Sequence, residues 1–233
     1  MKVKELKIIY DDLIGILIPD TCIFCSDSLN GSSSYLCDSC WAALPVFPDR
    51  SGTPFRALRG VLDRLWIGWD YEERLRRIIH LFKFHGRPEF AELLVDQWIS
   101  ALPHPDKIFC ADLLVPVPIH LARQRSRGFN QSELIADVVA QKYGIDEIDD
   151  EVLRVINTPP QFALGRSKRW QNLKDAFQVA NPAIIRQKRV LIIDDLATSG
   201  ATLHAIAVKL RENGAGEVSA AVLASPAYGG QAM

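Results

Sequence analysis

The sequence lacks a long hydrophobic run, a strong excess of charge of either sign and an internal repeat. Because a transmembrane helix needs about 20 consecutive apolar residues, we expect no membrane insertion. The net charge of −1 argues against a protein whose whole surface binds nucleic acid, although it allows a local basic patch. With 233 residues, 48% of them hydrophobic, the chain is long enough for one sizeable core or two modest ones.

A secretory signal is also missing. The N-terminal segment is rich in apolar residues, but Asp11 and Asp12 interrupt it and no small-residue cleavage site follows. The spacing predicts instead an amphipathic helix that ends at Pro19 and packs on the body of the protein or on a partner. We therefore expect a cytoplasmic protein.

Cysteines are few, and four of the five form two C-x-x-C pairs, Cys22 with Cys25 and Cys37 with Cys40. Four thiolates from two tight turns are the ligand pattern of zinc, and a shell of four cysteines is closed and therefore structural. Two disulfides or a redox C-x-x-C are the alternatives, but nothing indicates secretion, and a redox motif is normally single and lies beside a βαβ unit. We expect the fifth cysteine, Cys110, to be a small buried residue.

Strand and helix patterns alternate over the rest of the chain and predict an α/β fold, a mostly parallel sheet flanked by helices. Strands are predicted at 65–71, 112–117, 190–193 and 218–223, and helices at about 75–86, 88–101, 134–139 and 203–213. We divide the chain into an N-terminal helix and cysteine module (1–44), a linker rich in proline and glycine (45–60), an α/β domain (61–226) and a flexible tail (227–233).

The most informative stretch is an apolar run at 190–193 that leads into two acids and a loop. In order, the acids and the loop are Asp194, Asp195, Leu196, Ala197, Thr198, Ser199, Gly200, Ala201 and Thr202. The acids fall at the carboxyl end of a predicted buried strand, where open α/β sheets bind ligands. The loop enters a helix whose first N–H groups and dipole suit a phosphate, and its hydroxyls add donors.

Acids beside an anion cradle indicate a phosphorylated sugar, with the acids on sugar hydroxyls or on Mg²⁺. A buried strand that ends in a solvated acidic turn is the alternative. The stretch resembles the phosphoribosyl pyrophosphate (PRPP) signature of type I phosphoribosyltransferases. This resemblance implies that Asp194 and Asp195 hold the ribose hydroxyls at the catalytic centre, that residues 197–202 hold the 5′-phosphate and that Mg²⁺ arrives mainly with PRPP.

Basic residues follow the predicted strand at 112–117 and recur in a long, weakly periodic segment at 154–177. Arginine forms forked contacts with phosphate oxygens, and a lid would exclude water from a ribosyl centre that is easily hydrolysed. The residues that we assign to a pyrophosphate loop and to this lid are Pro116, Val117, Pro118, Arg123, Arg127 and Arg169. A solvated basic loop is the alternative for the first segment.

The order of these features is similar to that of the ComF family of phosphoribosyltransferase-like proteins. The four-cysteine module, the VPVP turn with R-x-R-G-F-N-Q, the lid with R-x-x-N and the acid signature follow one another over residues 19–223. The resemblance implies PRPP, Mg²⁺ and structural zinc as ligands, an unidentified acceptor, and a link to single-stranded DNA and the competence machinery of natural transformation. A PRPP sensor or a single-stranded-DNA-binding protein that reuses the fold is the alternative.

Two further features bear on these functions. The chain has no N-terminal cysteine nucleophile, so the glutamine-hydrolysing half of a true amidophosphoribosyltransferase is missing. A basic cluster lies near aromatic residues, as in proteins that bind single strands. Its members are Arg74, Arg76, Arg77, Lys83 and Arg87, with Trp66, Trp69 and Tyr71 nearby. We favour the plainer interpretation that the rings belong to the core and the charges to a solvated helix face.

Overall fold

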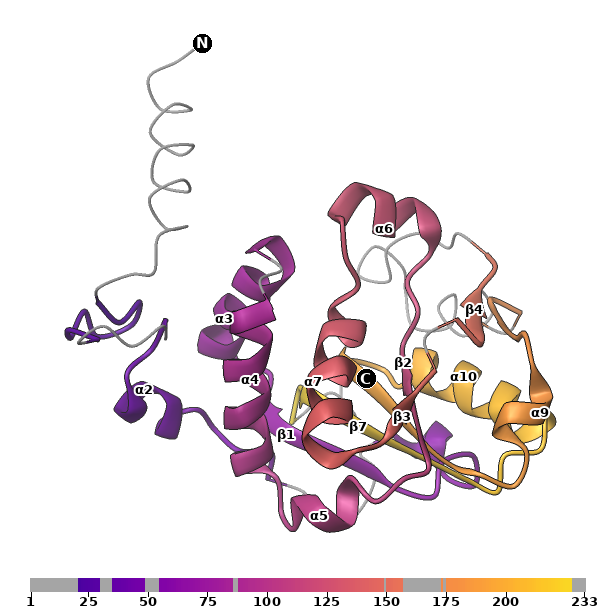
Figure 1. Ribbon diagram of the computed structural model, residues 1–233. Helices are drawn as coiled ribbons and strands as arrows, with labels where there is room; N and C mark the ends of the chain where they lie inside the picture. Colours follow the sequence, from indigo (N-terminus) through magenta and orange to yellow (C-terminus); the bar gives the residue numbers. More distant parts are fainter. Residues whose placement is uncertain are drawn as a thin grey trace.

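The computed structural model describes residues 21–29, 35–48, 55–85, 88–148, 150–156, 173 and 175–227 (Figure 1). Within these ranges, five strands form a sheet in the order β1-β7-β6-β2-β3, and every neighbouring pair is parallel. The strands are β1 (Leu65–Asp70), β2 (Leu113–Pro116), β3 (Asp146–Glu147), β6 (Arg189–Leu196) and β7 (Glu217–Ser225). The predicted parallel sheet is therefore confirmed.

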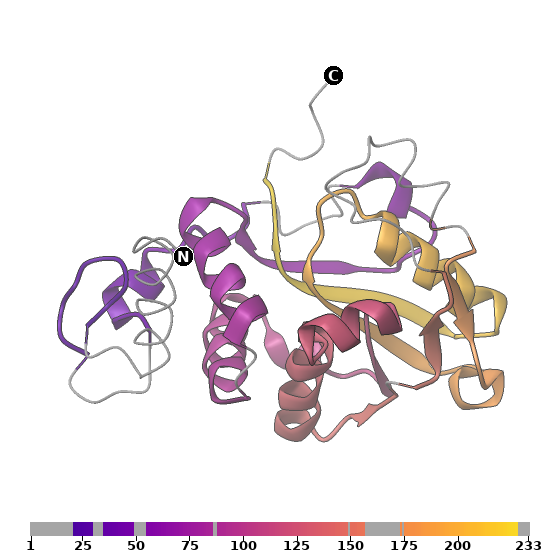
Figure 2. The same cartoon turned by 90° about the horizontal axis from the view of Figure 1, so that it is seen from above.

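Helices cover both faces of this sheet (Figures 1 and 2). Helices α3, α4 and α7 pack on one face, and α10 packs with η1 on the other. The helices are α2 (Asp38–Ala42), the 3-10 helix η1 (Arg56–Leu58), α3 (Glu73–His85), α4 (Pro88–Ala101), α5 (Pro105–Ile108), α6 (Leu121–Arg127), α7 (Gln131–Tyr143), α9 (Pro182–Ile185) and α10 (Ala201–Glu212). None of the helices in the described ranges combines the length and apolar character needed to cross a bilayer.

The apolar run of β6 is continuous because both faces of the strand are covered. Leu191 and Ile193 contribute to the core beneath α3, α4 and α7, whereas Val190 and Ile192 contribute to the core beneath α10. Successive side chains of a strand point to opposite faces, so a strand between two helical layers needs apolar residues at every position. The same arrangement carries the two acids that follow to the carboxyl edge of the sheet.

A close approach fixes α4 against β1. A Cβ atom added at Gly68 of β1 would lie 2.4 Å from Cδ1 of Trp98, a distance that no side chain tolerates. Trp98 is fully buried, and its ring packs edge-on against Phe109 at 5.6 Å between centroids. Glycine at this position therefore allows the largest fully buried side chain of the described core to lie directly on the sheet.

The cysteine module packs on the same core as α3 and α4. Tyr35 meets Phe90 edge-on at 4.8 Å between ring centroids, and Trp41 stacks on Trp69 of β1 at 6.3 Å. Residues 45–60, expected as a linker, place Phe47 in the core on the α10 side, and the Phe47 N–H donates to the Gly68 carbonyl at 3.0 Å. Apolar contacts therefore run without a break from the module into the domain.

A small antiparallel sheet brackets the predicted lid. It consists of β4 (Val152–Arg154) and β5 (Phe177–Val179), with Arg154 opposite Phe177. Strands of three residues are too short to produce a readable period, so the sequence did not indicate them. Within the predicted lid at 154–177, residues 157–172 and 174 lie outside the described residues, as do the predicted N-terminal helix and most of the predicted tail.

Candidate functional site

Two buried acids end strand β6 at the carboxyl edge of the sheet. Asp194 and Asp195 are each 9% exposed. The carboxylate of Asp194 accepts hydrogen bonds at Oδ1 from the Ser132 hydroxyl (3.0 Å) and from the backbone N–H of Asp195 (2.9 Å). Ser132 lies in the first turn of α7, where its own N–H donates to the side chain of the capping residue Asn130 at 3.2 Å. The start of α7 is thus fixed beside the acid.

The environment of Asp194 favours its protonated form. Burial, followed by the negative charge of Asp195, raises the pKa of Asp194 to about 7, and the hydrogen bond from Ser132 opposes this rise. A carboxyl group with this pKa is present in both protonation states near neutral pH. It can therefore donate a hydrogen bond or accept one, depending on what reaches it.

Asp195 has a cationic partner that sequence reasoning missed. The ammonium of Lys83 on α3 lies 2.8 Å from Asp195 Oδ2, and both side chains are largely shielded from solvent. Asp195 Oδ2 accepts no hydrogen bond of good geometry from the described atoms, so its contact with the Lys83 ammonium is an ion pair. The two residues are 112 positions apart, and Lys83 had been assigned only to the basic cluster. No local pattern could have indicated the pair, because it forms when α3 packs beside β6.

The loop after the acids needs glycine at one position. Gly200 has φ of 72°, in the left-handed region, and a Cβ there would lie 3.0 Å from Cγ of Phe55. The turn at Gly200 starts α10, and Ser199 Oγ accepts a hydrogen bond from the Ala201 N–H at 3.4 Å. With Asp194, residues 196–203 line a small cavity, so the predicted loop and the first acid do share one concave site. The free N–H end of a helix and the loop hydroxyls suit an anion there.

The predicted pyrophosphate loop lies beside the acids. Pro116 is paired with Ile193, and the Val117 N–H donates to the Ile193 carbonyl at 2.9 Å. The side-chain amide of Asn130 donates to the Val117 carbonyl at 3.0 Å, which ties this turn to the start of α7. Pro118 follows directly.

The structure does not place the predicted cationic partners of that loop. The side chains of Arg123 and Arg127 on α6, and the whole of Arg169, lie outside the described residues, so their assignment stays a prediction.

The four paired cysteines form one cluster. The sulfur atoms of Cys22, Cys25, Cys37 and Cys40 all lie within 4.8 Å of one another, and those of Cys25 and Cys37 are 3.6 Å apart. A tetrahedral zinc site with Zn–S bonds of about 2.3 Å places its sulfurs about 3.8 Å apart, so the arrangement fits zinc. All four are free thiols rather than disulfides.

The thiols of this cluster differ in how readily they ionise. Burial opposes ionisation of Cys22, but the backbone N–H groups of Cys25, Cys37 and Phe24 lower its pKa to about 6. Burial, followed by the neighbouring Cys22 thiol, raises the pKa of Cys40; the backbone N–H of Asp27 lowers the pKa of Cys25, but desolvation and the neighbouring side chains leave it raised. Thiolate is the form that binds metal, so of these shifts only that of Cys22 favours a bound ion. Cys110 lies outside the cluster and is exposed, so our expectation of a buried residue is wrong: the end of the short helix α5 leaves its side chain at the surface.

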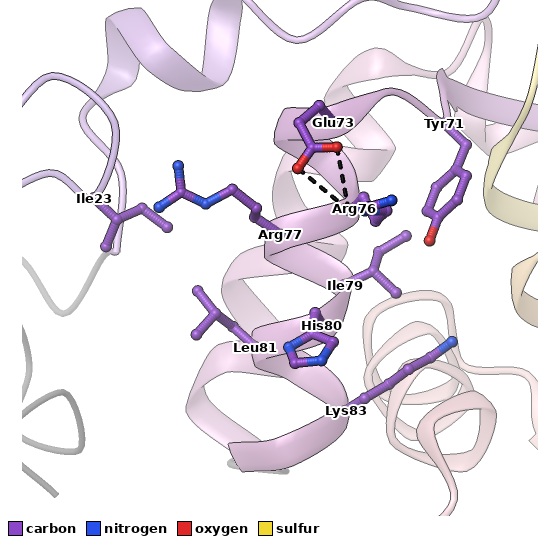
Figure 3. A pocket seen from close by; sticks show the side chains of 9 residues that line it. All are labelled: Ile23, Tyr71, Glu73, Arg76, Arg77, Ile79, His80, Leu81 and Lys83. Carbon is purple, nitrogen blue, oxygen red and sulfur yellow. Dashed lines mark hydrogen bonds and ion pairs between the residues drawn. The ribbon is translucent and has the colours of Figure 1, made fainter. Parts of the chain in front are cut away.

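A larger cavity of about 640 Å³ extends along α3 (Figure 3). Arg77 reaches from α3 toward Ile23 of the cysteine module, and Tyr71 and Lys83 lie on the other side of the helix. Trp69, by contrast, is 3% exposed and belongs to the core. The plainer interpretation of the aromatic residues therefore holds for Trp69, whereas Tyr71 is half-buried and lines the cavity.

Comparison with known proteins agrees with this geometry. The family model described as "Phosphoribosyl transferase domain" matches residues 112–231, which include β2, β6, the loop and β7. Competence protein F of Haemophilus influenzae is 27% identical over 218 residues, covering 84% of this chain and 93% of that protein.

Two other relatives match over shorter stretches. "DNA utilization protein YhgH" of Salmonella typhi is 34% identical over 158 residues, covering 64% of this chain and 66% of that protein. Competence protein ComFC of Bacillus subtilis is 30% identical over 148 residues, covering 63% of this chain and 57% of that protein. Among solved structures, the glutamine PRPP amidotransferase from B. subtilis overlaps 61% of this chain and 30% of its own, at 20% identity and a TM-score of 0.36.

Proposed function

The chain belongs to the phosphoribosyltransferase domain family, as a ComF-type member, and from this premise we propose that it binds Mg²⁺–PRPP and transfers the phosphoribosyl group to an acceptor. One observation carries the proposal: a buried acid pair at the end of β6 adjoins a glycine-dependent loop that starts α10. A sugar phosphate carries both hydroxyls and a phosphate. The acids can accept hydrogen bonds from the hydroxyls, and the N–H groups at the start of the helix can bind the phosphate.

Each group has a role in this proposal. Asp194 and Asp195 accept hydrogen bonds from the two ribose hydroxyls, and the amides and hydroxyls of 198–202 bind the 5′-phosphate. The turn at 116–118 lies beside the departing pyrophosphate. Mg²⁺ supplies positive charge on the pyrophosphate oxygens. The ion pair of Asp195 with Lys83 supports this division, because that carboxylate already has a cationic partner in place of a metal ion.

The reaction breaks the bond between the ribose anomeric carbon and the pyrophosphate oxygen, which keeps the electron pair. The carbon becomes cationic in the transition state, and the lone pair of the acceptor forms the new bond. Carboxylates held beside this carbon stabilise the positive charge, and the fixed loops hold the reactants in place. No covalent enzyme intermediate is needed.

Calorimetry with Mg²⁺–PRPP tests the binding step. We expect the native protein to bind and Asp195→Asn to bind at least tenfold more weakly, because the ribose loses a charged acceptor that contributes about 1.5–3 kcal/mol. Asp106→Asn is the matched control, since Asp106 is an exposed acid on α5 at the opposite edge of the sheet. If the native protein gives no heat of binding, the assignment of the acids and the loop to PRPP is wrong.

A second measurement separates enzyme from sensor. Release of pyrophosphate in the presence of nucleophiles supports transfer, whereas tight binding of PRPP without release with any nucleophile supports a sensor. The zinc cluster has no part in this chemistry, because its four thiolates would close the metal shell and leave it a structural cross-link.

Single-stranded DNA binding is a second candidate function, linked to DNA uptake through the names of the relatives. The supporting observation is the row of exposed arginines at 74, 76 and 77 on α3, two of which lie over the ring of Phe24. If the protein binds single-stranded DNA, fluorescence anisotropy should detect a salt-dependent affinity for single strands that falls when Arg76 and Arg77 become alanine. An affinity unchanged by both substitutions would contradict it.

A further inference from the structure

The cavity along α3 shares a wall with the acid pair. Lys83 lines the cavity, and its ammonium also lies 2.8 Å from Asp195. Tyr71, on the same side of α3 in Figure 3, follows β1, and its N–H donates to the carbonyl of Ser225 at the end of β7 at 2.9 Å. The cavity therefore opens at the same carboxyl edge of the sheet as the acids. Its volume of about 640 Å³ is in the usual range for a small-molecule site.

The strand order gives this cavity a definite position relative to the leaving group. In the sheet β1-β7-β6-β2-β3, the acids end β6 and the turn proposed for pyrophosphate follows β2, on one side of them. In a direct displacement, the incoming atom approaches carbon from the side opposite the leaving group. The acceptor must then arrive over β7 and β1, and that is the side on which Tyr71 and the cavity lie.

The charges along the cavity favour an anion. Arg77 lies with its guanidinium 5.2 Å from the centre of the Phe24 ring, and none of the described carboxylates forms an ion pair with it. Arg76 pairs with Glu73 at 3.4 Å, but both side chains are more than 60% exposed, so water screens this pair and the arginine can exchange partners at little cost. Arg76 lies about two turns of α3 before Lys83, about 10 Å along the helix axis, and therefore on the same face of the helix.

Building on the proposed function, we infer that this cavity is the acceptor subsite and that the acceptor is an anionic small molecule. Its carboxylate or phosphate binds Arg76, which lines the cavity on the side of α3 where Tyr71 and Lys83 lie (Figure 3), and its nucleophilic atom lies near Lys83, facing the ribose carbon. The lone pair of that atom forms the new bond to the anomeric carbon as the bond to pyrophosphate breaks. Pyrophosphate leaves with the electron pair, and the proton lost by the nucleophile passes to water at the open mouth of the cavity.

A matched pair of probes tests the inference. Para-aminobenzoate and para-aminobenzamide have the same amine and ring but differ in one negative charge. In the presence of Mg²⁺–PRPP, we expect the acid to bind, and to drive pyrophosphate release, with a kcat/KM at least tenfold above that of the amide. Arg76→Glu should abolish or invert this preference.

Arg64→Glu is the control, because it makes the same charge change at an exposed site before β1, on the opposite edge of the sheet. It should keep the preference for the acid. The inference is overturned if PRPP binds but the acid neither binds better nor reacts faster than the amide, or if Arg76→Glu leaves the ratio unchanged. Absence of PRPP binding by the native protein would instead overturn the proposed function, so the two failures can be told apart.

Discussion

Asp194 should make the stability of the protein depend on pH in an unusual direction. Its pKa is about 7 in the folded protein and near 3.8 when unperturbed. The folded state therefore holds the proton more tightly than the unfolded chain, and this carboxyl supports folding most when protonated. Its contribution is complete below about pH 4 and is lost as the pH rises to about 7. Three pH units at 1.36 kcal/mol each give a loss of up to about 4 kcal/mol.

The substitution Asp194→Asn keeps the shape of the side chain and removes the titration. The free energy of unfolding, measured in urea between pH 5 and 8, should fall with rising pH by more in the native protein than in the variant. The comparison cancels acid loss of metal from the cysteine cluster, which is common to both proteins. The low pKa of Asp112, about 2 because of its hydrogen bonds from Arg189, affects stability only below this range.

A second substitution should shift the decline in stability to higher pH. Ser132→Ala removes the hydroxyl that stabilises the ionised form of Asp194, so it should raise the pKa further and extend the decline in stability to higher pH. Parallel curves of stability against pH for the native protein and Asp194→Asn would refute the reasoning, because they would mean that Asp194 has the same pKa in both states.

Two further predictions concern the metal and the core. Protein purified under reducing conditions should contain one zinc per chain by metal analysis, and Cys37→Ser should lower this content, whereas Cys110→Ser, which changes an exposed cysteine outside the cluster, should leave it unchanged. Gly68→Ala should lower the free energy of unfolding by about 1–3 kcal/mol in urea, because the new methyl group would lie 2.4 Å from Trp98. Trp98→Phe in the same chain should recover part of that loss relative to Trp98→Phe alone, and a full loss in the double variant would contradict the proposed clash.

Features that are contiguous in the sequence were predicted well. The acids and the loop follow one another along the chain, so the strand pattern before them and the helix pattern after them were enough to bring Asp194 and residues 196–203 to one cavity. The two C-x-x-C pairs are equally local, and each brings two sulfur atoms from one turn to the cluster that could hold a metal. Short elements without periodicity, such as β4 and β5, could not be found in this way.

The sequence by itself determined the parallel sheet, the position of the acids at its edge and the pairing of the cysteines in two C-x-x-C turns, because all three depend on patterns within a few neighbouring residues. Only the tertiary structure decided which side chains meet the acids. Lys83 and Ser132 come from helices far along the chain, and they reach Asp195 and Asp194 because the packing of α3 and α7 on one face of the sheet brings them there. Such contacts depend on how buried surfaces fit together, and no periodicity in the chain encodes that fit.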